Sequence, residues 1–148
     1  MKTILVLFVI FGTFSLGFCD ECPEGFVNLG SRCYYFSKET ASWLEASRKC
    51  TEMEASLLAI QTSSEAQLIF DQAVKLNVRN IPIGYWTSGM LTKVSNVRKP
   101  SFVWTSTWEP FTYTAWCNGE PNNWENDEYC VHLTTLQKHN TRACWNDR

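Results

Sequence analysis

The sequence has no excess of basic residues and none of the patterns that mark several large protein classes. Its 13 Lys and Arg face 15 Asp and Glu, which leaves a formal net charge of −2. A nucleic acid partner requires a dense basic face on the protein, so nucleic acid binding is not expected. The chain also has no internal repeat, no low-complexity stretch and no Asn-x-Ser/Thr glycosylation site. Its 148 residues fit one globular domain.

Motifs of the common enzyme classes are missing too. There is no G-x-S-x-G elbow, no H-E-x-x-H helix and no P-loop. Acidic residues cluster toward the C-terminal end and could serve general acid/base chemistry, as in glycosidases. Asparagines are interleaved with them, however, and that mixture fits ion ligation better. We therefore expect that the protein is not an enzyme.

No apolar run is long enough to span a bilayer, which takes about 20 residues. The longest, Ile4–Phe14, follows Lys2 and precedes small residues. This arrangement indicates a secretory signal, with cleavage after residue 19 or after Gly17, and an N-terminal anchor is the alternative. The expected organisation is a signal peptide at 1–19 and one secreted domain at 20–148.

Cysteines and aromatic residues are abundant. Seven cysteines in an exported chain indicate disulfides, and seven Trp and nine Phe supply apolar area for a core. Apolar residues recur at spacings of three and four in about Ala41–Glu54 and in Ser63–Leu76, which predicts two helices. Thr62 with Glu65 fits a capping box before the second helix. Residues 22–36 are typical of a hairpin. The expected fold class is α+β.

The stretch from Asn77 to Asp127 has no long hydrophobic period, and two short strands are expected after it, at 128–133 and 141–145. So long a stretch in a compact domain is uncommon unless it is functional or tied down. Oxygen-bearing side chains of the kind that calcium takes cluster in and after it, although a solvated acidic loop has a similar composition. Pro121 favours a site, because a cis bond can aim the side chains on either side of it in one direction. The clustered side chains are Glu120, Asn122, Glu125, Asn126, Asp127, Glu128, Asn146 and Asp147.

Three short motifs in this region resemble those of the C-type lectins. They are Glu120-Pro121-Asn122, Glu128-x-Cys130 and Trp145-Asn146-Asp147, in the order and spacing of that family. The resemblance covers about residues 22–148 and includes the two predicted helices. It implies the C-type lectin fold, which has two helices, small antiparallel sheets and a long calcium-binding loop.

The resemblance implies one calcium ion, held by three carboxylates and two amide oxygens, with open positions for two neighbouring sugar hydroxyls. In the family, the order Glu-Pro-Asn goes with sugars whose 3- and 4-hydroxyls are both equatorial. The expected ligands are therefore glycans with mannose, N-acetylglucosamine or fucose. Trp124 lies where galactose-binding members place a stacking aromatic, but it also fits a packing role within the loop. The implied calcium ligands are Glu120, Asn122, Glu128, Asn146 and Asp147, and the implied carbohydrate contacts are Glu120, Asn122, Trp124, Glu128 and Asn146.

A second calcium site, which some members of the family have, is not expected. Asn123 and Tyr129 stand where carboxylates would be needed, and Pro100 falls near another such position. Calcium at one principal site is the cofactor that the resemblance implies.

The resemblance also implies two disulfides. Cys22 with Cys33 matches the N-terminal bridge of the long form of the domain. Cys130 with Cys144 is expected to clamp the base of the sugar-binding loop.

The other cysteines have no partner that the sequence identifies. In the family, Cys50 pairs with a cysteine after the Trp-Asn-Asp motif, and none follows it here. The domain is therefore expected to be C-terminally truncated, with its final strand missing. Cys117 is an additional cysteine, and it could form a disulfide with Cys50, with Cys19 or with a cysteine of another chain.

Two further interpretations stay open. Cys130, His132, His139 and Cys144 offer zinc ligands, although an oxidising compartment favours a disulfide. A C-type lectin-like module can also recognise a protein or a surface without sugar, but retention of all five calcium ligands favours the lectin.

A secreted lectin domain of this kind suggests recognition of glycans in innate immunity. Because single sites of this type bind weakly, an oligomer is a further expectation.

Overall fold

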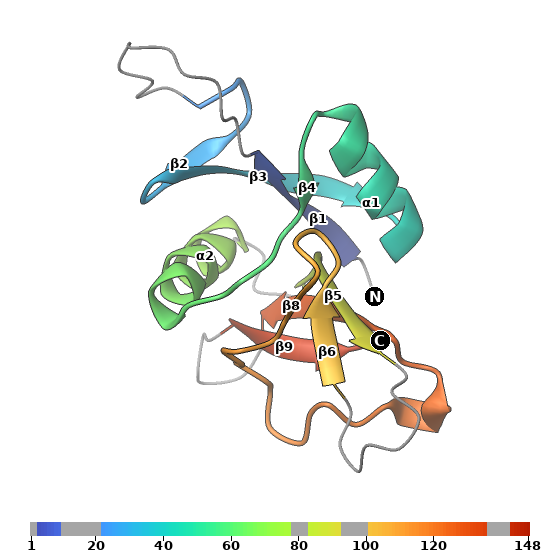
Figure 1. Cartoon of the computed structure of the whole chain (residues 1–148). Helices are drawn as coiled ribbons and strands as arrows, with labels where there is room; N and C mark the ends of the chain where they lie inside the picture. The colour runs from blue at the N-terminus through green and yellow to red at the C-terminus, as the bar shows by residue number, and fades with distance from the viewer. Residues whose placement is uncertain (1–2, 10–21, 78–82, 93–100, 136–142) are drawn as a thin grey trace.

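The computed structural model describes residues 3–9, 22–77, 83–92, 101–135 and 143–148 (Figure 1). Two helices and a mostly antiparallel sheet in these ranges make an α+β fold, as expected. None of the helices in the described ranges is long and apolar enough to cross a membrane.

Helix α1 spans Trp43–Glu52, within two residues of its predicted range at each end. Ser42 caps it, because its hydroxyl accepts from the N–H of Glu45 and the Glu45 carboxylate accepts from the N–H of Ser42. Trp43 fixes the helix to the sheet through its indole N–H, which donates to the carbonyl of Thr87 at 2.8 Å. The start of α1 is therefore held by its own cap and by a tertiary hydrogen bond.

Helix α2 spans Ser63–Leu76, which is the predicted range. Thr62 accepts from the N–H of Glu65 at 3.2 Å. The Glu65 carboxylate does not complete the expected capping box with Thr62, however. It accepts instead from the N–H of Gln61 at 3.1 Å, while its other oxygen is held by Arg32 of the neighbouring hairpin.

Strands β2 (Val27–Leu29) and β3 (Arg32–Thr40) form the hairpin expected near the N-terminus. The turn between them contains Gly30 at φ +73°, in the left-handed region that favours glycine. A disulfide joins Cys22 to Cys33, with 5.6 Å between the Cα atoms. The disulfide thus ties the segment before β2 to the beginning of β3.

The segment expected to be a secretory signal contributes a strand to the sheet. β1 (Thr3–Val9) runs antiparallel to β3 and parallel to β5 (Ile83–Thr92), so its backbone lies between them (Figure 1). It also pairs with β4 (Ser56–Leu57). Residues 10–19 lie outside the described residues, and removal of the leader stays a prediction.

Strand β5 connects the two parts of the sheet. It pairs with β1, with β6 (Ser101–Trp104) and with β8 (Cys130–Thr135), while β7 (Glu109–Pro110) pairs with β6 and β9 (Ala143–Asp147) pairs with β8. Its first seven residues are all buried, because both faces of the strand are covered. The stretch 77–127, which showed no hydrophobic period, therefore contains three strands. Both C-terminal strands end two residues later than expected.

The core beneath β9 is aromatic. Trp104 and Trp145 are fully buried and meet edge to face, with 5.3 Å between ring centroids. Phe111 stacks on Trp104 at 3.9 Å. Because Trp145 directly precedes Asn146 and Asp147, this cluster fixes the end of the strand that carries both polar side chains.

Candidate functional site

Backbone contacts hold the loop after Trp116 beside the end of β9. Trp116 forms an isolated parallel bridge with Trp145. The N–H of Cys117 donates to the carbonyl of Trp145 at 2.8 Å, and the N–H of Trp145 donates to the carbonyl of Ala115 at the same distance. The beginning of the loop is therefore registered against the strand residue that precedes Asn146.

Cys144 is bonded to Cys117 and not to Cys130, so the expected pairing is wrong. In the β8–β9 ladder Cys144 lies opposite Thr134, whereas Cys130 exchanges backbone hydrogen bonds with Arg148. Four residues of extended strand separate Cys130 from Thr134, about 13 Å, which exceeds the Cα separation that a disulfide allows. The Cα atoms of Cys117 and Cys144 are 5.0 Å apart.

Cys50 and Cys130 are the free cysteines of the described chain. Burial raises the pKa of the Cys50 thiol to about 12 and that of Cys130 to about 11, so both stay protonated and weakly nucleophilic. The zinc alternative fails because the sulfur of Cys144 is committed to a disulfide. His139, its fourth ligand, lies outside the described residues.

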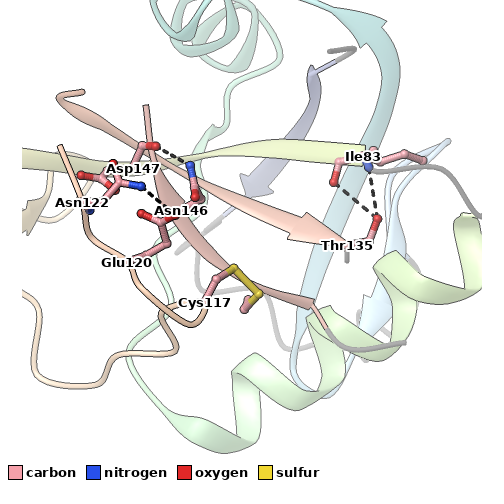
Figure 2. The surroundings of a disulfide bond; sticks show 8 residues. Ile83, Cys117, Glu120, Asn122, Thr135, Asn146 and Asp147 are labelled. Atoms are coloured by element: carbon pink, nitrogen blue, oxygen red, sulfur yellow. Dashed lines mark hydrogen bonds between the residues drawn. A yellow bond between two sulfur atoms is a disulfide. The ribbon is translucent and has the colours of Figure 1, made fainter. Parts of the chain in front are cut away.

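The Glu120–Pro121 peptide bond is cis. The side-chain amide of Asn122 donates to Glu120 Oε1 at 3.0 Å, so the two side chains lie together (Figure 2). The second carboxylate oxygen, Glu120 Oε2, is buried and has no hydrogen-bond partner. A buried carboxylate oxygen without a partner is costly, and a bound cation would satisfy it.

The Asp147 carboxylate is fully buried and receives the loop backbone. Its Oδ1 accepts from the N–H of Asn122 at 3.1 Å, and its Oδ2 accepts from the N–H of Asn123 at 2.9 Å. The side-chain amide of Asn146 donates to the carbonyl of Asp147. Glu120, Asn122, Asn146 and Asp147 converge in one place, as Figure 2 shows, although Glu120 and Asp147 are far apart in the sequence.

Glu128 lies at the edge of this group. Its Oε2 accepts from the N–H of Trp124 at 2.8 Å. Trp124 begins the short 3₁₀ turn η1 (Trp124–Asn126) and its side chain is 68% exposed. This exposure argues against the packing role and leaves the indole face open to a ligand.

Asn123 organises the loop, which sequence reasoning missed. Its side-chain oxygen accepts from the N–H of Glu128 at 3.1 Å, while its own N–H donates to Asp147. It adopts φ +44°, and Glu125 and Asn126 are also left-handed, at +56° and +59°. Asparagine tolerates left-handed backbone better than most residues, so the asparagines of this loop were the signal in the sequence that could have predicted its sharp turns.

Like charges meet at this site. The pKa of Glu120 is raised above its usual value, first by burial and then by the neighbouring carboxylates of Asp147 and Glu128. A divalent cation would offset that repulsion, and carboxylate and amide oxygens are the donors that calcium prefers. Within the described ranges, no group of three or more His, Cys, Asp or Glu side chains is placed to hold a metal. The carboxylates alone therefore do not form a metal site, and a calcium ion here would also need the amide oxygens of Asn122 and Asn146, which are donors of the type that calcium takes.

The chain is similar in fold to solved C-type lectin structures. It matches the crystal structure of the C-type lectin CEL-I from Cucumaria echinata with a TM-score of 0.69 at 21% identity, over 87% of this chain and 89% of that one. It also matches a calcium-independent type II antifreeze protein with a TM-score of 0.61 at 24% identity, over 86% and 84% of the two chains. At these identities the likeness concerns the fold alone.

Sequence comparison identifies the family. Residues 39–148 match the family model of the Lectin C-type domain. A perlucin-like protein of Mytilus galloprovincialis is 29% identical over 147 residues, 97% of this chain and 87% of the relative. A C-type lectin of Micrurus corallinus is 31% identical over 150 residues, 97% and 85% of the two chains. The protein belongs to the C-type lectin domain family, whose domains are in general not enzymes.

Proposed function

We propose that this protein is a secreted, calcium-dependent lectin that binds mannose-type glycans. The observation that carries the proposal is the buried, unpartnered Oε2 of Glu120 next to the buried carboxylate of Asp147. Both carboxylates are held in place by the loop backbone or by Asn122. The carboxylates of Glu120 and Asp147 are fixed and buried, and one of their oxygens lacks a hydrogen bond, so this arrangement is suited to binding a cation.

Five residues would hold the ion. When bound, calcium supplies coordination positions for two neighbouring hydroxyls of one sugar ring. The protein side chains then complete each hydroxyl, because a carboxylate accepts its proton and an asparagine amide donates to its oxygen. The residues are Glu120, Asn122, Glu128, Asn146 and Asp147.

The sugar preference is proposed from the tripeptide. Glu120 and Asn122 determine which hydroxyl donates and which accepts, and in this order they favour equatorial 3- and 4-hydroxyls. Mannose and N-acetylglucosamine offer such a pair and galactose does not, while fucose offers its equatorial 2- and 3-hydroxyls instead. The exposed ring of Trp124 adds stacking only for a sugar already placed by the hydroxyl pair.

Secretion and avidity complete the proposal. Two disulfides and the apolar leader indicate export. A shallow monosaccharide site suggests a dissociation constant of about 1 mM, so several domains on one surface would be needed for glycan recognition in innate immunity. Cys117 does not link chains in this structure, since it is bonded to Cys144. Cys19 lies outside the described residues.

The test is calorimetry of calcium and methyl mannoside binding by variants of the site. We expect Glu128→Ala and Asn146→Ala to lose both ligands, because each removes an ion ligand and a sugar partner together. Glu125→Ala is the matched control, since Glu125 is an exposed acid of the same loop outside the proposed ligand set. Mannoside binding that survives excess EDTA would refute the proposal.

The specificity is tested by exchanging the two flanking residues. Glu120→Gln with Asn122→Asp should reverse the preference toward galactose, by about 1–3 kcal/mol if mismatched hydroxyls leave polar groups unpaired. Trp124 should then contribute to galactose binding by stacking. If galactose competes with mannose equally well for the unaltered protein, the tripeptide does not set the specificity.

A second candidate function follows from Glu128. Its hydrogen bond to the N–H of Trp124 stabilises the loop without an ion, which favours a module that binds a protein or a surface instead. The two candidates differ on a mannose column. A calcium-dependent lectin is retained in calcium and eluted by a chelator, whereas the alternative module is not retained.

A further inference from the structure

A groove with both polar and apolar lining lies away from the long loop, between the β2–β3 turn and the first two turns of α2. Its volume is about 270 Å³, and none of the proposed calcium ligands lines it. One wall is the turn from Leu29 to Arg32, and the other runs from Gln61 to Leu68 along α2. Pockets for small molecules begin at about 300 Å³, so this one suits a single small ring.

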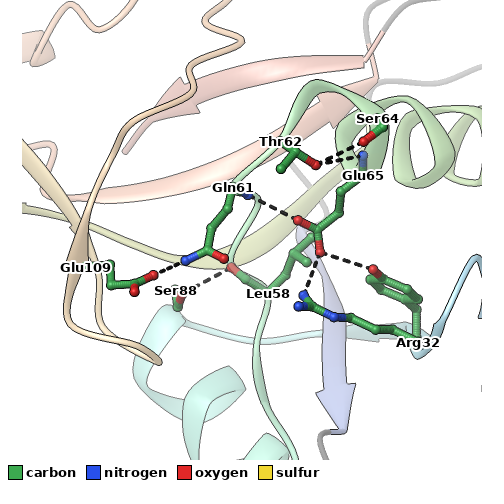
Figure 3. Close-up of polar contacts among 9 residues, drawn as sticks. Arg32, Leu58, Gln61, Thr62, Ser64, Glu65, Ser88 and Glu109 are labelled. Carbon is green, nitrogen blue, oxygen red and sulfur yellow. Dashed lines mark hydrogen bonds and ion pairs between the residues drawn. The ribbon is translucent and has the colours of Figure 1, made fainter.

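The charges in the groove cancel each other. Glu65 Oε1 accepts from Arg32 at 3.0 Å and from the Tyr34 hydroxyl at 3.2 Å, and Oε2 accepts from the N–H of Gln61 at 3.1 Å (Figure 3). The Glu65 side chain is only 13% exposed, so the ion pair with Arg32 is partly shielded from water. A ligand therefore meets a neutral surface. An anion would be repelled by Glu65, and a cation would compete with Arg32.

Neutral hydroxyl and amide groups line the rim. Ser31, Thr62 and Ser64 are exposed, and the hydroxyls of Thr62 and Ser64 lie 3.2 Å apart. The side-chain amide of Gln61 bonds to Glu109 of β7, which fixes that corner of the groove (Figure 3). These groups both donate and accept hydrogen bonds, which suits a ligand that carries hydroxyls around a ring.

One apolar side chain is exposed inside the groove. Leu68 is 43% exposed although it is a large aliphatic residue. Opposite it, a Cβ added to Gly30 would lie 3.3 Å from Leu68 Cδ1, so the turn approaches the leucine closely because it has glycine there. The groove thus combines an apolar patch with a hydroxyl-bearing rim. The C–H face and the hydroxyl edge of a sugar ring match these two surfaces.

We propose that this groove is a second, calcium-independent binding site for an uncharged sugar residue, remote from the long loop. Its ligand class is a neutral polyhydroxylated ring, held by the rim hydroxyls with its apolar face on Leu68. Glu65 is a positioning residue, because it orients Arg32, Tyr34 and the start of α2 without contacting the ligand. The site does not depend on the function proposed for the loop.

The test is an NMR titration of the ¹⁵N-labelled full chain with the neutral trisaccharide mannotriose in excess EDTA. The chelator removes any contribution of the calcium loop. We expect the amide signals of Ser31, Arg32 and Ser64 to shift and to saturate in the millimolar range, while Glu120 and Glu128 stay unchanged. Titration in calcium without EDTA then reports on the loop separately.

Three substitutions on α2 test the groove and its surroundings separately. Ser64→Met places a larger side chain in the groove and should weaken mannotriose by about tenfold in EDTA, the scale of one or two lost polar contacts. Gln67→Met is the matched control, because Gln67 is exposed on α2 and does not line the groove. Leu68→Ser keeps the rim but removes the apolar patch, and it should weaken binding as well.

No shift at residues 29–32 and 61–65 in EDTA overturns the proposal, whatever happens at the loop. Equal weakening by Gln67→Met and Ser64→Met also overturns it. Shifts that appear only in calcium and only near Glu120 support the loop function and reject the second site.

Discussion

Cys117 is bonded to Cys144, across 27 residues of chain. The bond joins the first part of the site loop to the strand that ends in Asn146 and Asp147. The backbone N–H groups of Asn122 and Asn123 donate to the Asp147 carboxylate, so the loop is joined to the same strand at a second point. A covalent link therefore holds the loop close to the proposed calcium ligands.

The first prediction concerns that bond. Replacing Cys117 and Cys144 together by serine should lower the free energy of unfolding by about 3.5 kcal/mol in the chain-entropy model, and should weaken calcium and mannoside binding. Urea denaturation and calorimetry measure the two effects. The Cys22→Ser, Cys33→Ser double variant is the control, because it removes a disulfide far from the loop and should lower stability alone. Unchanged mannoside affinity in the first variant would show that the bond does not organise the site.

A second prediction concerns acid sensitivity of the site. The raised pKa of Glu120 means that the folded, ion-free protein takes up a proton there at higher pH than an ordinary glutamate does. Calcium binding must displace that proton, so the calcium affinity should begin to fall on acidification above the usual glutamate range. In Asp147→Asn the pKa of Glu120 should fall, because the neighbouring charge is gone. The ¹³C chemical shift of the Glu120 carboxyl, followed against pH in EDTA, checks both statements.

A third prediction concerns His132, which is buried under the site against Trp86. Burial, and then the charge of Arg148, lower its pKa from 6.5 to about 4. The unfolded chain therefore binds the proton more readily than the native protein does. Above pH 6.5 the neutral His132 side chain costs the folded protein no stability relative to the unfolded chain. As the pH falls toward 4, protonation of the unfolded chain lowers the free energy of unfolding by about 3 kcal/mol in total.

Urea denaturation between neutral pH and pH 5, in EDTA, measures this loss. His132→Gln should show a smaller decrease across the same interval, because its side chain does not titrate. Parallel pH profiles for the two proteins would contradict the assignment to His132. The Glu120 carboxyl has the opposite sign, since a raised carboxyl pKa favours the fold as the pH falls, and it cancels in the comparison.

A fourth prediction concerns β1. Its backbone pairs with β3, β4 and β5, so a chain that begins at Asp20 leaves an edge of each of these three strands without its partner. Compared with the full chain, it should unfold at lower urea concentration and should self-associate. Denaturation and sedimentation velocity measure both. Equal stability of the two chains would mean that β1 contributes nothing to the fold.

Local patterns predicted the helices well. The apolar spacing in α2 and the cap at Thr62 depend only on neighbours within four residues, and the predicted range is the observed one. Strand β5 was missed because its first seven residues are buried on both faces and show no alternation. Period and composition carry no signal for such a strand.

The site was predictable only in part. The motifs identify the residues around Glu120 and Asp147, but the partner of Cys144 depends on the register of β8 and β9, which spacing in the sequence does not reveal. The role of Asn123 and the contact of Glu128 with Trp124 depend on the path of the loop, which includes three left-handed residues. Glu65 was assigned to a cap, and its bonds to the hairpin need the tertiary structure.

The contrast in tryptophan exposure gives the protein an optical reporter. Trp104 and Trp145 are fully buried, whereas Trp124 is 68% exposed and Trp108 is 77% exposed. Acrylamide should therefore quench chiefly the red edge of the emission, where Trp124 and Trp108 dominate. A sugar bound at the proposed calcium site would shield Trp124, and one bound only in the groove beside α2 would not. With Trp108→Phe the red-edge signal becomes specific for the loop, so ligand occupancy there can be read by steady-state fluorescence without any attached label.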